Sequence, residues 1–386
     1  MTARTRQLTR RVLGTIGVLA LAVASVGSGL DRASGGSPAL SALVPGPLRS
    51  QADRTTAQLA LAMMEPRTAV AAAQSAVAAD PVDPGSTALL GAARLLGNDF
   101  AGSEQAFRVA ARFGWRELLT QRYWYTAAVQ AGDYERAAER LDALLRTRPE
   151  LPGAEDLLMP LETDPAAQGA LVRRLAERPL WLRTYLNPFG ARTDIIARRS
   201  TMLELLARQG TQLGCDAVRG FVGKALASGS RATAQRVWLG HCPGATLSGL
   251  LIDGGLAQLA SGDPSPFGWT VERSGDVTVR TEQTGEDKFR LVLRNRAGVS
   301  RLVLRQAIDL PPGRYRLRAT GAANTFAASL GCERGPGVPR LVVGDLAAGG
   351  QELRVLEPCS RLELGIWLRP TPQDVALAGL ALERID

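Results

Sequence analysis

The hydrophobic pattern of the chain changes once, at a segment rich in glycine, serine and proline that spans residues 261–266. Before this segment, apolar side chains recur with the 3.6-residue period of amphipathic helices. After it, short apolar and polar alternations are separated by turn residues, which is typical of antiparallel strands that bury one face. The sequence therefore predicts a multidomain chain, α then β, with a helical domain at 51–262 and an antiparallel β-sandwich of the jelly-roll kind at 267–386.

An uncharged stretch of 19 residues, 12–30, follows four arginines at the N-terminus. As a helix it is long enough to cross a bilayer. Because arginines precede the stretch and are scarce just after it, the positive-inside rule predicts a single-pass protein whose body is periplasmic in a bacterium. We expect residues 1–30 to form a signal-anchor or transmembrane segment in the inner membrane. The alternative is a signal peptide cleaved after Ala22-Val23-Ala24, which would leave a soluble periplasmic protein.

The segment 31–50 is rich in glycine, serine and proline and has no periodicity. Such composition is typical of a flexible linker. From residue 51 the sequence becomes rich in alanine and leucine with helical spacing, so we expect the linker to end there.

The charged and catalytic residue types exclude several functions. The chain has 46 Lys and Arg against 37 Asp and Glu, and acidic residues are interleaved with basic ones. This pattern is typical of a solvated surface, so we predict no nucleic-acid partner. His241 is the one histidine, which excludes multi-histidine metal sites, and the motifs of nucleotide, hydrolase and zinc-protease sites are absent. We predict no catalytic residues, no metal, no cofactor and no enzymatic activity.

The four cysteines are Cys215, Cys242, Cys332 and Cys359, and none forms a C-x-x-C motif. An exported compartment permits disulfides, and four cysteines allow three connectivities. We favour Cys215–Cys242 and Cys332–Cys359, because each pair then lies within one predicted domain. Buried free thiols are the alternative.

The clearest helical hairpin lies at residues 116–151. It resembles a tetratricopeptide repeat, in which a Gly-Asp-aromatic turn precedes a small residue, a large apolar residue and a helix-ending proline. The matching residues are Gly132, Asp133, Tyr134, Ala137, Leu141 and Pro149. An upstream hairpin carries Asn98-Asp99-Phe100 and Ala106 in comparable roles, with shifted spacing. The resemblance implies a solenoid of helical hairpins that binds a protein partner of the envelope.

The sandwich sequence DLPPGRYRLRATG, at 309–321, and the closing LERID resemble jelly-roll domains of the carbohydrate-binding and galactose-binding-like type. This resemblance implies that the domain binds a glycan. Sugar rings pack on exposed aromatic faces, and the candidate rings are Trp269, Tyr315 and Trp367.

The whole arrangement of membrane segment, repeat-like helices and sandwich resembles alphaproteobacterial envelope proteins, some of them associated with exopolysaccharide production. The resemblance implies a non-enzymatic, membrane-tethered periplasmic scaffold, or adaptor, that binds an envelope protein and a polysaccharide. Two alternatives stay open. One is an envelope-assembly scaffold whose sandwich binds protein only, and the other is a glycan-modifying enzyme with a shallow carboxylate site.

Overall fold

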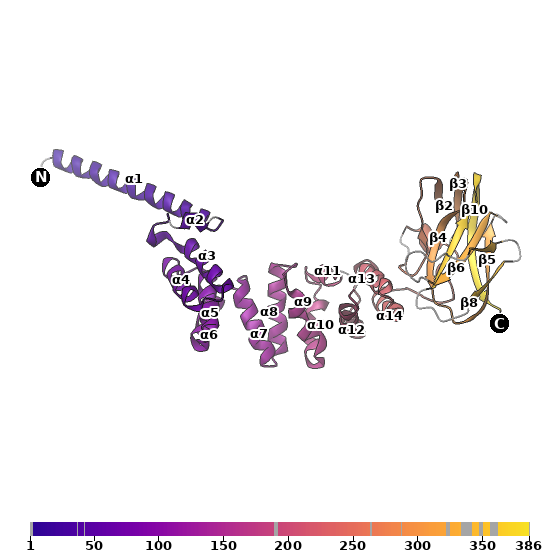
Figure 1. The fold of residues 1–386 in the computed structure, drawn as a ribbon, viewed down its shortest axis with the longest axis horizontal. Helices are drawn as coiled ribbons and strands as arrows, with labels where there is room; N and C mark the ends of the chain where they lie inside the picture. Colours follow the sequence, from indigo (N-terminus) through magenta and orange to yellow (C-terminus); the bar gives the residue numbers. More distant parts are fainter. Residues whose placement is uncertain are drawn as a thin grey trace. The chain divides into compact units, whose positions relative to one another are not determined.

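A computed structural model describes most of the 386 residues. The described ranges are 3–36, 38–41, 43–188, 192–262, 265–286, 288–321, 325–332, 342–346, 350–355 and 362–385. Residue contacts divide the chain into two compact units, Met1–Leu182 and Arg183–Asp386. The first is helical, and the second begins with helices and ends with two antiparallel sheets (Figure 1). The predicted fold class is therefore confirmed, with the last helices grouped with the sandwich.

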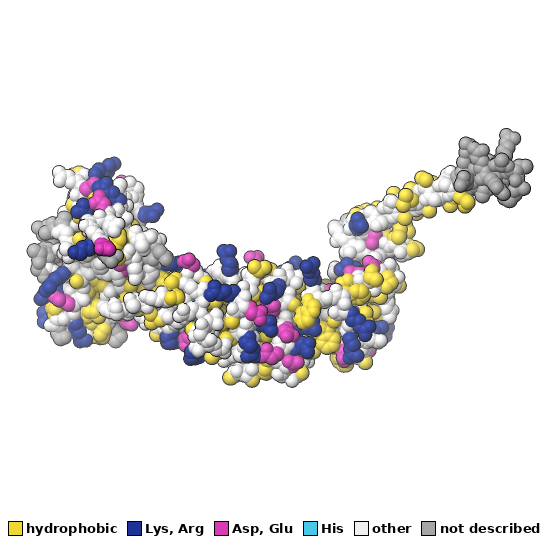
Figure 2. Space-filling view, turned by 180° about the vertical axis from the view of Figure 1, so that it is seen from behind, with side chains coloured by type: hydrophobic (Ala, Val, Ile, Leu, Met, Phe, Trp, Pro, Cys, Tyr) yellow, Lys and Arg dark blue, Asp and Glu magenta, His cyan; other side chains and the backbone are white. Residues whose placement is uncertain are grey.

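The N-terminal helix α1 (Ala3–Ser34) contains a segment, Val12–Ser34, that is long and apolar enough to cross a membrane or to be a signal sequence. Its apolar side chains lie uncovered in Figure 2, at the upper right. The helix extends beyond residue 30, where the sequence predicted that a linker begins.

The predicted linker contains ordered elements. It includes the end of α1, the short helix α2 (Pro38–Ser41) and the 3₁₀ turn η1 (Gly46–Leu48). The buried Asp31 carboxylate accepts hydrogen bonds from the backbone nitrogens of Gln51, at 3.0 Å, and Ala52, at 2.9 Å. These nitrogens belong to the first turn of α3, where a negative charge is stabilised by the helix dipole. The composition of the segment does not reveal this contact across 20 residues.

Antiparallel helical pairs follow one another in the first unit. Their bounds are α3 (Ser50–Ala62), α4 (Pro66–Ala79), α5 (Pro84–Leu96), α6 (Phe100–Ala111), α7 (Leu118–Gln130), α8 (Tyr134–Thr147), α9 (Ala154–Thr163) and α10 (Pro165–Ala176). A short helix, α11 (Leu182–Tyr185), follows at the boundary between the units. The first helices of the first three pairs, α3, α5 and α7, begin 34 residues apart, and so do their second helices, α4, α6 and α8. These six helices therefore form three structural repeats of equal length.

The turn inside each of these three pairs is the same. Met64, Asn98 and Gly132 have positive φ angles of 60°, 63° and 72°. The residue after each is the N-cap of the next helix, and the carboxylates of Asp99 and Asp133 accept from backbone nitrogens of that helix. The spacing of Asn98-Asp99-Phe100 is therefore not shifted, which corrects the expectation from sequence.

The small and the large apolar residue of the predicted motif are both buried. Ala137 is fully buried, and so are Ser103 one repeat earlier and Ala69 two repeats earlier, which places Ser103 rather than Ala106 at the small-residue position. Leu141 is buried, and Pro149 follows the end of α8. The Tyr134 hydroxyl donates to the Asp164 carboxylate, and this hydrogen bond raises the pKa of Tyr134 and lowers that of Asp164.

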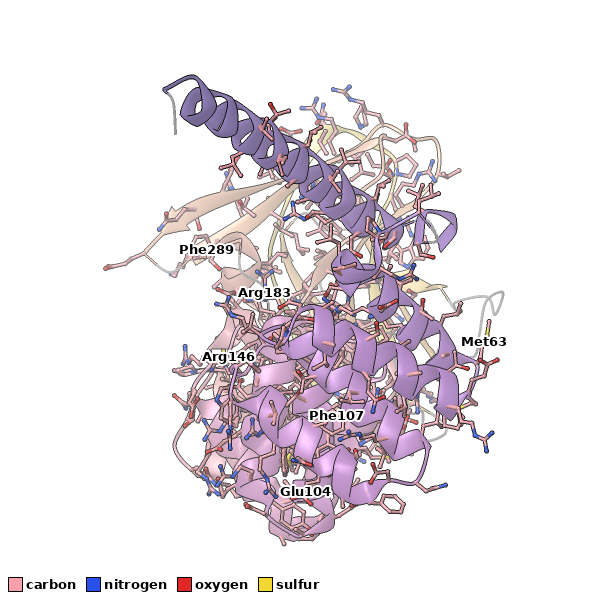
Figure 3. All side chains as sticks on the ribbon, turned by 90° about the vertical axis from the view of Figure 1, so that its left-hand side faces the viewer. Met63, Glu104, Phe107, Arg146, Arg183 and Phe289 are labelled. Carbon is pink, nitrogen blue, oxygen red and sulfur yellow. A yellow bond between two sulfur atoms is a disulfide. The ribbon has the colours of Figure 1, made fainter. Side chains whose placement is uncertain are left out.

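Small residues line the contacts among α3, α4, α5 and α6. A Cβ atom added at Gly91 would lie 2.9 Å from the Phe107 ring, so glycine permits the close approach of α5 and α6. Phe107 lies inside the hairpins, whereas Met63 projects outward and is 59% exposed (Figure 3).

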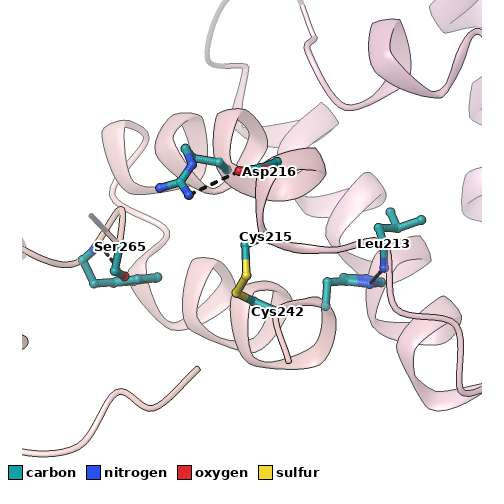
Figure 4. The surroundings of a disulfide bond; sticks show 8 residues. Leu213, Cys215, Asp216, Cys242 and Ser265 are labelled. Atoms are coloured by element: carbon teal, nitrogen blue, oxygen red, sulfur yellow. Dashed lines mark hydrogen bonds and ion pairs between the residues drawn. A yellow bond between two sulfur atoms is a disulfide. The ribbon is translucent and has the colours of Figure 1, made fainter. Parts of the chain in front are cut away.

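The second unit begins with α12 (Thr193–Arg208), α13 (Cys215–Ala227), α14 (Arg231–His241) and the single turn α15 (Ala257–Ala260). A disulfide joins Cys215, the first residue of α13, to Cys242, which follows α14 (Figure 4). This is one of the two predicted pairs. For the other pair, Cys359 and the side chain of Cys332 lie outside the described residues.

Two five-stranded sheets form the sandwich in the part of the chain that is described. Sheet A has the order β1-β4-β9-β6-β7, and sheet B has the order β2-β3-β10-β5-β8. The strand bounds are β1 (Thr270–Val271), β2 (Val277–Gly285), β3 (Lys288–Asn295), β4 (Arg301–Ile308), β5 (Gly313–Gly321), β6 (Phe326–Cys332), β7 (Val342–Asp345), β8 (Gln351–Val355), β9 (Leu362–Leu368) and β10 (Thr371–Arg384). Every pair of neighbouring strands is antiparallel, and large apolar side chains fill the space between the sheets.

Candidate functional site

Two of the three candidate rings belong to the sandwich core. Trp269 is 1% exposed and its indole nitrogen donates to the Asp253 carbonyl at 3.1 Å. Tyr315 is fully buried and its hydroxyl donates to the Pro311 carbonyl at 2.7 Å. The backbone thus satisfies the polar end of each ring while its apolar part packs in the core. Neither ring can stack on a sugar, so the prediction is corrected for both.

Trp367 has a different environment, on the outer face of sheet A. It is half-buried, and its neighbours Ile366 and Leu368 point into the core. Because side chains alternate along a strand, the outer face of β9 carries Glu363, Gly365 and Trp367. This candidate ring is therefore the one that lies on the outside of the sandwich.

The indole of Trp367 lies across Gly365. Its nitrogen donates to the Ser329 hydroxyl at 2.7 Å, and Ser329 is the β6 residue paired with Gly365. A Cβ atom at Gly365 would lie 2.7 Å from the Ser329 hydroxyl oxygen, 2.9 Å from Leu302 Cδ1 and 3.4 Å from the Trp367 nitrogen. The glycine thus makes room for the indole of Trp367 next to the side chains of Ser329 and Leu302.

A charged group lies beside Gly365 on the same face. Arg305 of β4 is paired with Gly365 in the register of the sheet. Its guanidinium forms ion pairs with Glu272 and, at 3.5 Å, with Glu363. Burial alone would lower the pKa of Arg305, but the two carboxylates outweigh it and the pKa is raised. The face therefore combines an aromatic ring with guanidinium and carboxylate groups.

Nothing in the sequence pointed to Ser329, Gly365 or Leu302. They come from three strands that are far apart in the chain, and only the register of sheet A brings them under Trp367. Alternation along β9 could have placed Trp367 opposite the core residues Leu364 and Ile366, but it could not have identified what lies under the ring.

A cavity of about 1430 Å³ lies in the second unit, next to this face. Its walls come from α13, from the turn between α13 and α14, and from strands of both sheets. Thr270, Arg305, Ala307 and Glu363, all on the outer face of sheet A, line one wall. The cavity is thus continuous with the surface that carries Trp367.

The imidazole of His241 lies in the helical part of this unit and is fully buried. Its Nδ1 accepts from the Leu213 backbone nitrogen at 3.3 Å, and its Nε2 lies 2.9 Å from the Leu203 carbonyl oxygen. Burial lowers the pKa of His241, although the hydrogen bond to Leu203 opposes the shift. The ring links α12 and α14 in its neutral form. Among the described residues, no group of three or more His, Cys, Asp or Glu side chains could hold a metal ion.

No protein-family model matches the chain, and no curated protein matches it. Among solved structures, the chain is similar to the carbohydrate-binding module TmCBM61, which was solved in complex with β-1,4-galactotriose. The match has 15% sequence identity and a TM-score of 0.24, and it covers 36% of this chain and 99% of that one. A similarity at this level identifies neither a family nor a ligand.

Proposed function

We propose that this chain is a membrane-anchored, non-enzymatic scaffold whose sandwich binds a polysaccharide of the cell envelope on the outer face of sheet A. The observation that carries the proposal is the Trp367 ring on the outer face of sheet A, where its nitrogen donates to Ser329 and lies beside Gly365. The C–H faces of a sugar ring pack on such a platform, and its hydroxyls bond to neighbouring polar groups. Here Arg305 and Glu363 supply those groups.

Binding of the full chain, in detergent micelles, to a panel of neutral and acidic polysaccharides tests this function by affinity electrophoresis. We expect Trp367→Ala to weaken binding about tenfold or more, whereas Trp367→Phe keeps an aromatic face and retains most of it. The matched control is Phe113→Ala, which removes an aromatic side chain that is 46% exposed in the first unit. Wild-type binding by Trp367→Ala would overturn the proposed site. Failure of the wild-type chain to bind any polysaccharide would favour a scaffold that binds protein only.

We also propose that α3 to α8 are three tetratricopeptide repeats and that they bind a protein partner. The support is the 34-residue interval of their helices and turns, which is the length of that repeat. A groove of about 830 Å³ in this unit is lined in part by Trp115, Arg116 and Arg146. A photo-crosslinking residue at Arg116 should capture one discrete envelope protein in cells, and the same residue at Val82, which is 70% exposed elsewhere, should not. Equal capture at both positions would contradict the groove.

Retention of α1 as an anchor, with the body of the chain in the periplasm, completes the proposal. A Cβ atom at Gly27 would lie 2.6 Å from Leu48 Cδ1, so the end of the helix packs on η1, and Asp31 holds α3. The apolar helix is therefore continuous with a packed element of the first unit. The intact mass of the protein from membranes should include residues 1–24. A mature chain that begins after Ala24 would instead show that the segment is a cleaved signal.

A role in exopolysaccharide production follows from these two binding activities acting together. Loss of the gene should lower the yield of exported polysaccharide, and the wild-type gene should restore it where the Trp367→Ala gene does not. Full restoration by the variant would separate the glycan site from that role.

A further inference from the structure

We infer that the polysaccharide is acidic and that its carboxylate groups bind in the arginine-lined cavity beside the Trp367 face. This inference rests on the proposed function and names the ligand class of that site. The charged residues that line the cavity are Arg219, Arg231, Arg273, Arg280, Arg305 and Glu363.

Three of these arginines already have carboxylate partners. Arg280 pairs with Asp374 at 2.8 Å, Arg219 with Asp216 at 3.5 Å, and Arg305 with Glu363 and Glu272. Their charges are thus compensated within the protein. These three arginines form part of the cavity wall but add little to its net charge.

Arg231 differs because it is half-buried and forms no ion pair, and only the more distant carboxylate of Asp309 attracts its charge. Its Nη1 donates to the Ala307 carbonyl at 3.1 Å, and its guanidinium carbon lies 5.5 Å from the centre of the Phe267 ring. Its Nε is buried and has no hydrogen-bond partner, and the guanidinium forms no ion pair with any carboxylate in the described part of the chain. A buried charge of this kind is costly unless an anion pairs with it.

Arg273 supplies a second charge without an ion pair. It is exposed, lines the same cavity, and forms no ion pair with a carboxylate of the described residues. A guanidinium binds a carboxylate through two parallel hydrogen bonds, which makes arginine well suited to recognise acidic sugars. Two such groups in one cavity favour a ligand with repeated negative charges.

The register of sheet A joins the cavity to the aromatic platform. Thr270 and Arg305 are paired and line the cavity, and Arg305 is also paired with Gly365. Trp367 lies two residues further along β9, a distance of about 7 Å along a strand. A single polysaccharide chain can therefore stack one sugar on Trp367 while the carboxylate of a nearby sugar enters the cavity.

Polygalacturonate and its fully methyl-esterified form provide a matched pair of probes, since esterification removes the charge and keeps the backbone. We expect the full chain in detergent micelles to bind polygalacturonate about tenfold more tightly than the ester, with an affinity that falls as salt is raised. Arg231→Gln and Arg273→Gln should each reduce this preference. Arg208→Gln, which removes an exposed arginine of α12, should leave it unchanged.

The Arg273 variant keeps the test decisive if Arg231→Gln loosens the contact between α14 and β4. Equal binding of the two polymers, or wild-type preference in both the Arg231 and Arg273 variants, would overturn the acidic ligand. The proposed function would still stand in that case if Trp367→Ala lost binding to a neutral polysaccharide of the panel. Absence of binding to every polysaccharide would overturn both.

Discussion

The helical hairpins α3 to α6 and the β-sandwich differ in the size of the side chains that they bury. In the hairpins, the fully buried positions include Ala57, Ala69, Ala73 and Ala93. In the sandwich, the core consists mainly of leucine, isoleucine and valine with Trp269, Tyr315 and Phe326. Helices that meet through small side chains approach closely, whereas stacked sheets lie about 10 Å apart and need long side chains to fill the space. Added volume should therefore damage the hairpins, and removed volume should damage the sandwich.

The two regions also differ in how far a disturbance should spread. Each hairpin contacts its neighbours along the chain, as α3 contacts α4 and α5. In the sandwich, β4 pairs with β9 and β3 pairs with β10, so each sheet depends on strands distant in sequence. A change in the sandwich should loosen both sheets, while a change in a hairpin should remain near its site.

The largest effect is expected from Leu364→Ala in the centre of sheet A, where the side chain is fully buried. Truncation leaves a cavity and should lower the free energy of unfolding of the sandwich by about 2–5 kcal/mol. Hydrogen exchange measured peptide by peptide should accelerate in both sheets and stay unchanged in α3 to α8. Val299→Ala, at a side chain that is 58% exposed, is the control. Acceleration confined to β9 would contradict the cooperative sandwich.

A smaller effect is expected from Ala73→Leu in α4, which adds side-chain volume where Leu364→Ala removes it. This position is fully buried against α3 and α5, so a larger side chain should destabilise the hairpins by about 1–3 kcal/mol. The exchange rates of α3 to α6 should rise while those of the sandwich stay constant. Ala71→Leu, on the exposed side of the same helix, should have little effect. A stabilised Ala73→Leu variant would show that this interface accommodates the larger side chain, which would contradict the prediction.

The smallest effect is a pH dependence of stability. We expect it to differ between the two units because His241 lies in the second. Its pKa is lowered in the folded state, so the unfolded chain binds more protons between that pKa and about 6.5. The contribution of neutral His241 is complete above about pH 6.5 and is lost as the pH falls. Hydrogen exchange of α12 to α14 should therefore accelerate between pH 7.5 and 5.5, after correction for the intrinsic rate, more than that of α3 to α8. His241→Gln should remove this difference, and its persistence in the variant would assign it to other groups.

Much of the fold could be predicted from local sequence. The alternation from 288 to 295 and from 301 to 308 identifies β3 and β4, and the turn at Gly132-Asp133 identifies the hairpin of α7 and α8. Both signals depend on neighbouring residues, whose side-chain directions follow from the period of the backbone. The Cys215–Cys242 pair could be proposed because both residues lie in one short stretch of helices.

The candidate site was only partly predictable. Trp269, Tyr315 and Trp367 look alike in sequence, each being an aromatic residue in an alternating strand. Their burial differs because the Asp253 and Pro311 carbonyls accept from the first two, while Trp367 lies over Gly365 on the opposite side of its sheet. These partners are set by loops and by strand register, which composition does not encode locally.

The sequence by itself determined the order of the structural elements along the chain: an apolar helix, repeated helical hairpins and then alternating strands. It did so because hydrophobic periodicity and turn chemistry act within a few residues. Only the tertiary structure decided that Asp31 holds α3, that Gly365 supports Trp367, and that the half-buried Arg231 forms no ion pair in the described part of the chain. Those features arise from contacts between distant segments, whose geometry exists only once the helices and sheets have packed.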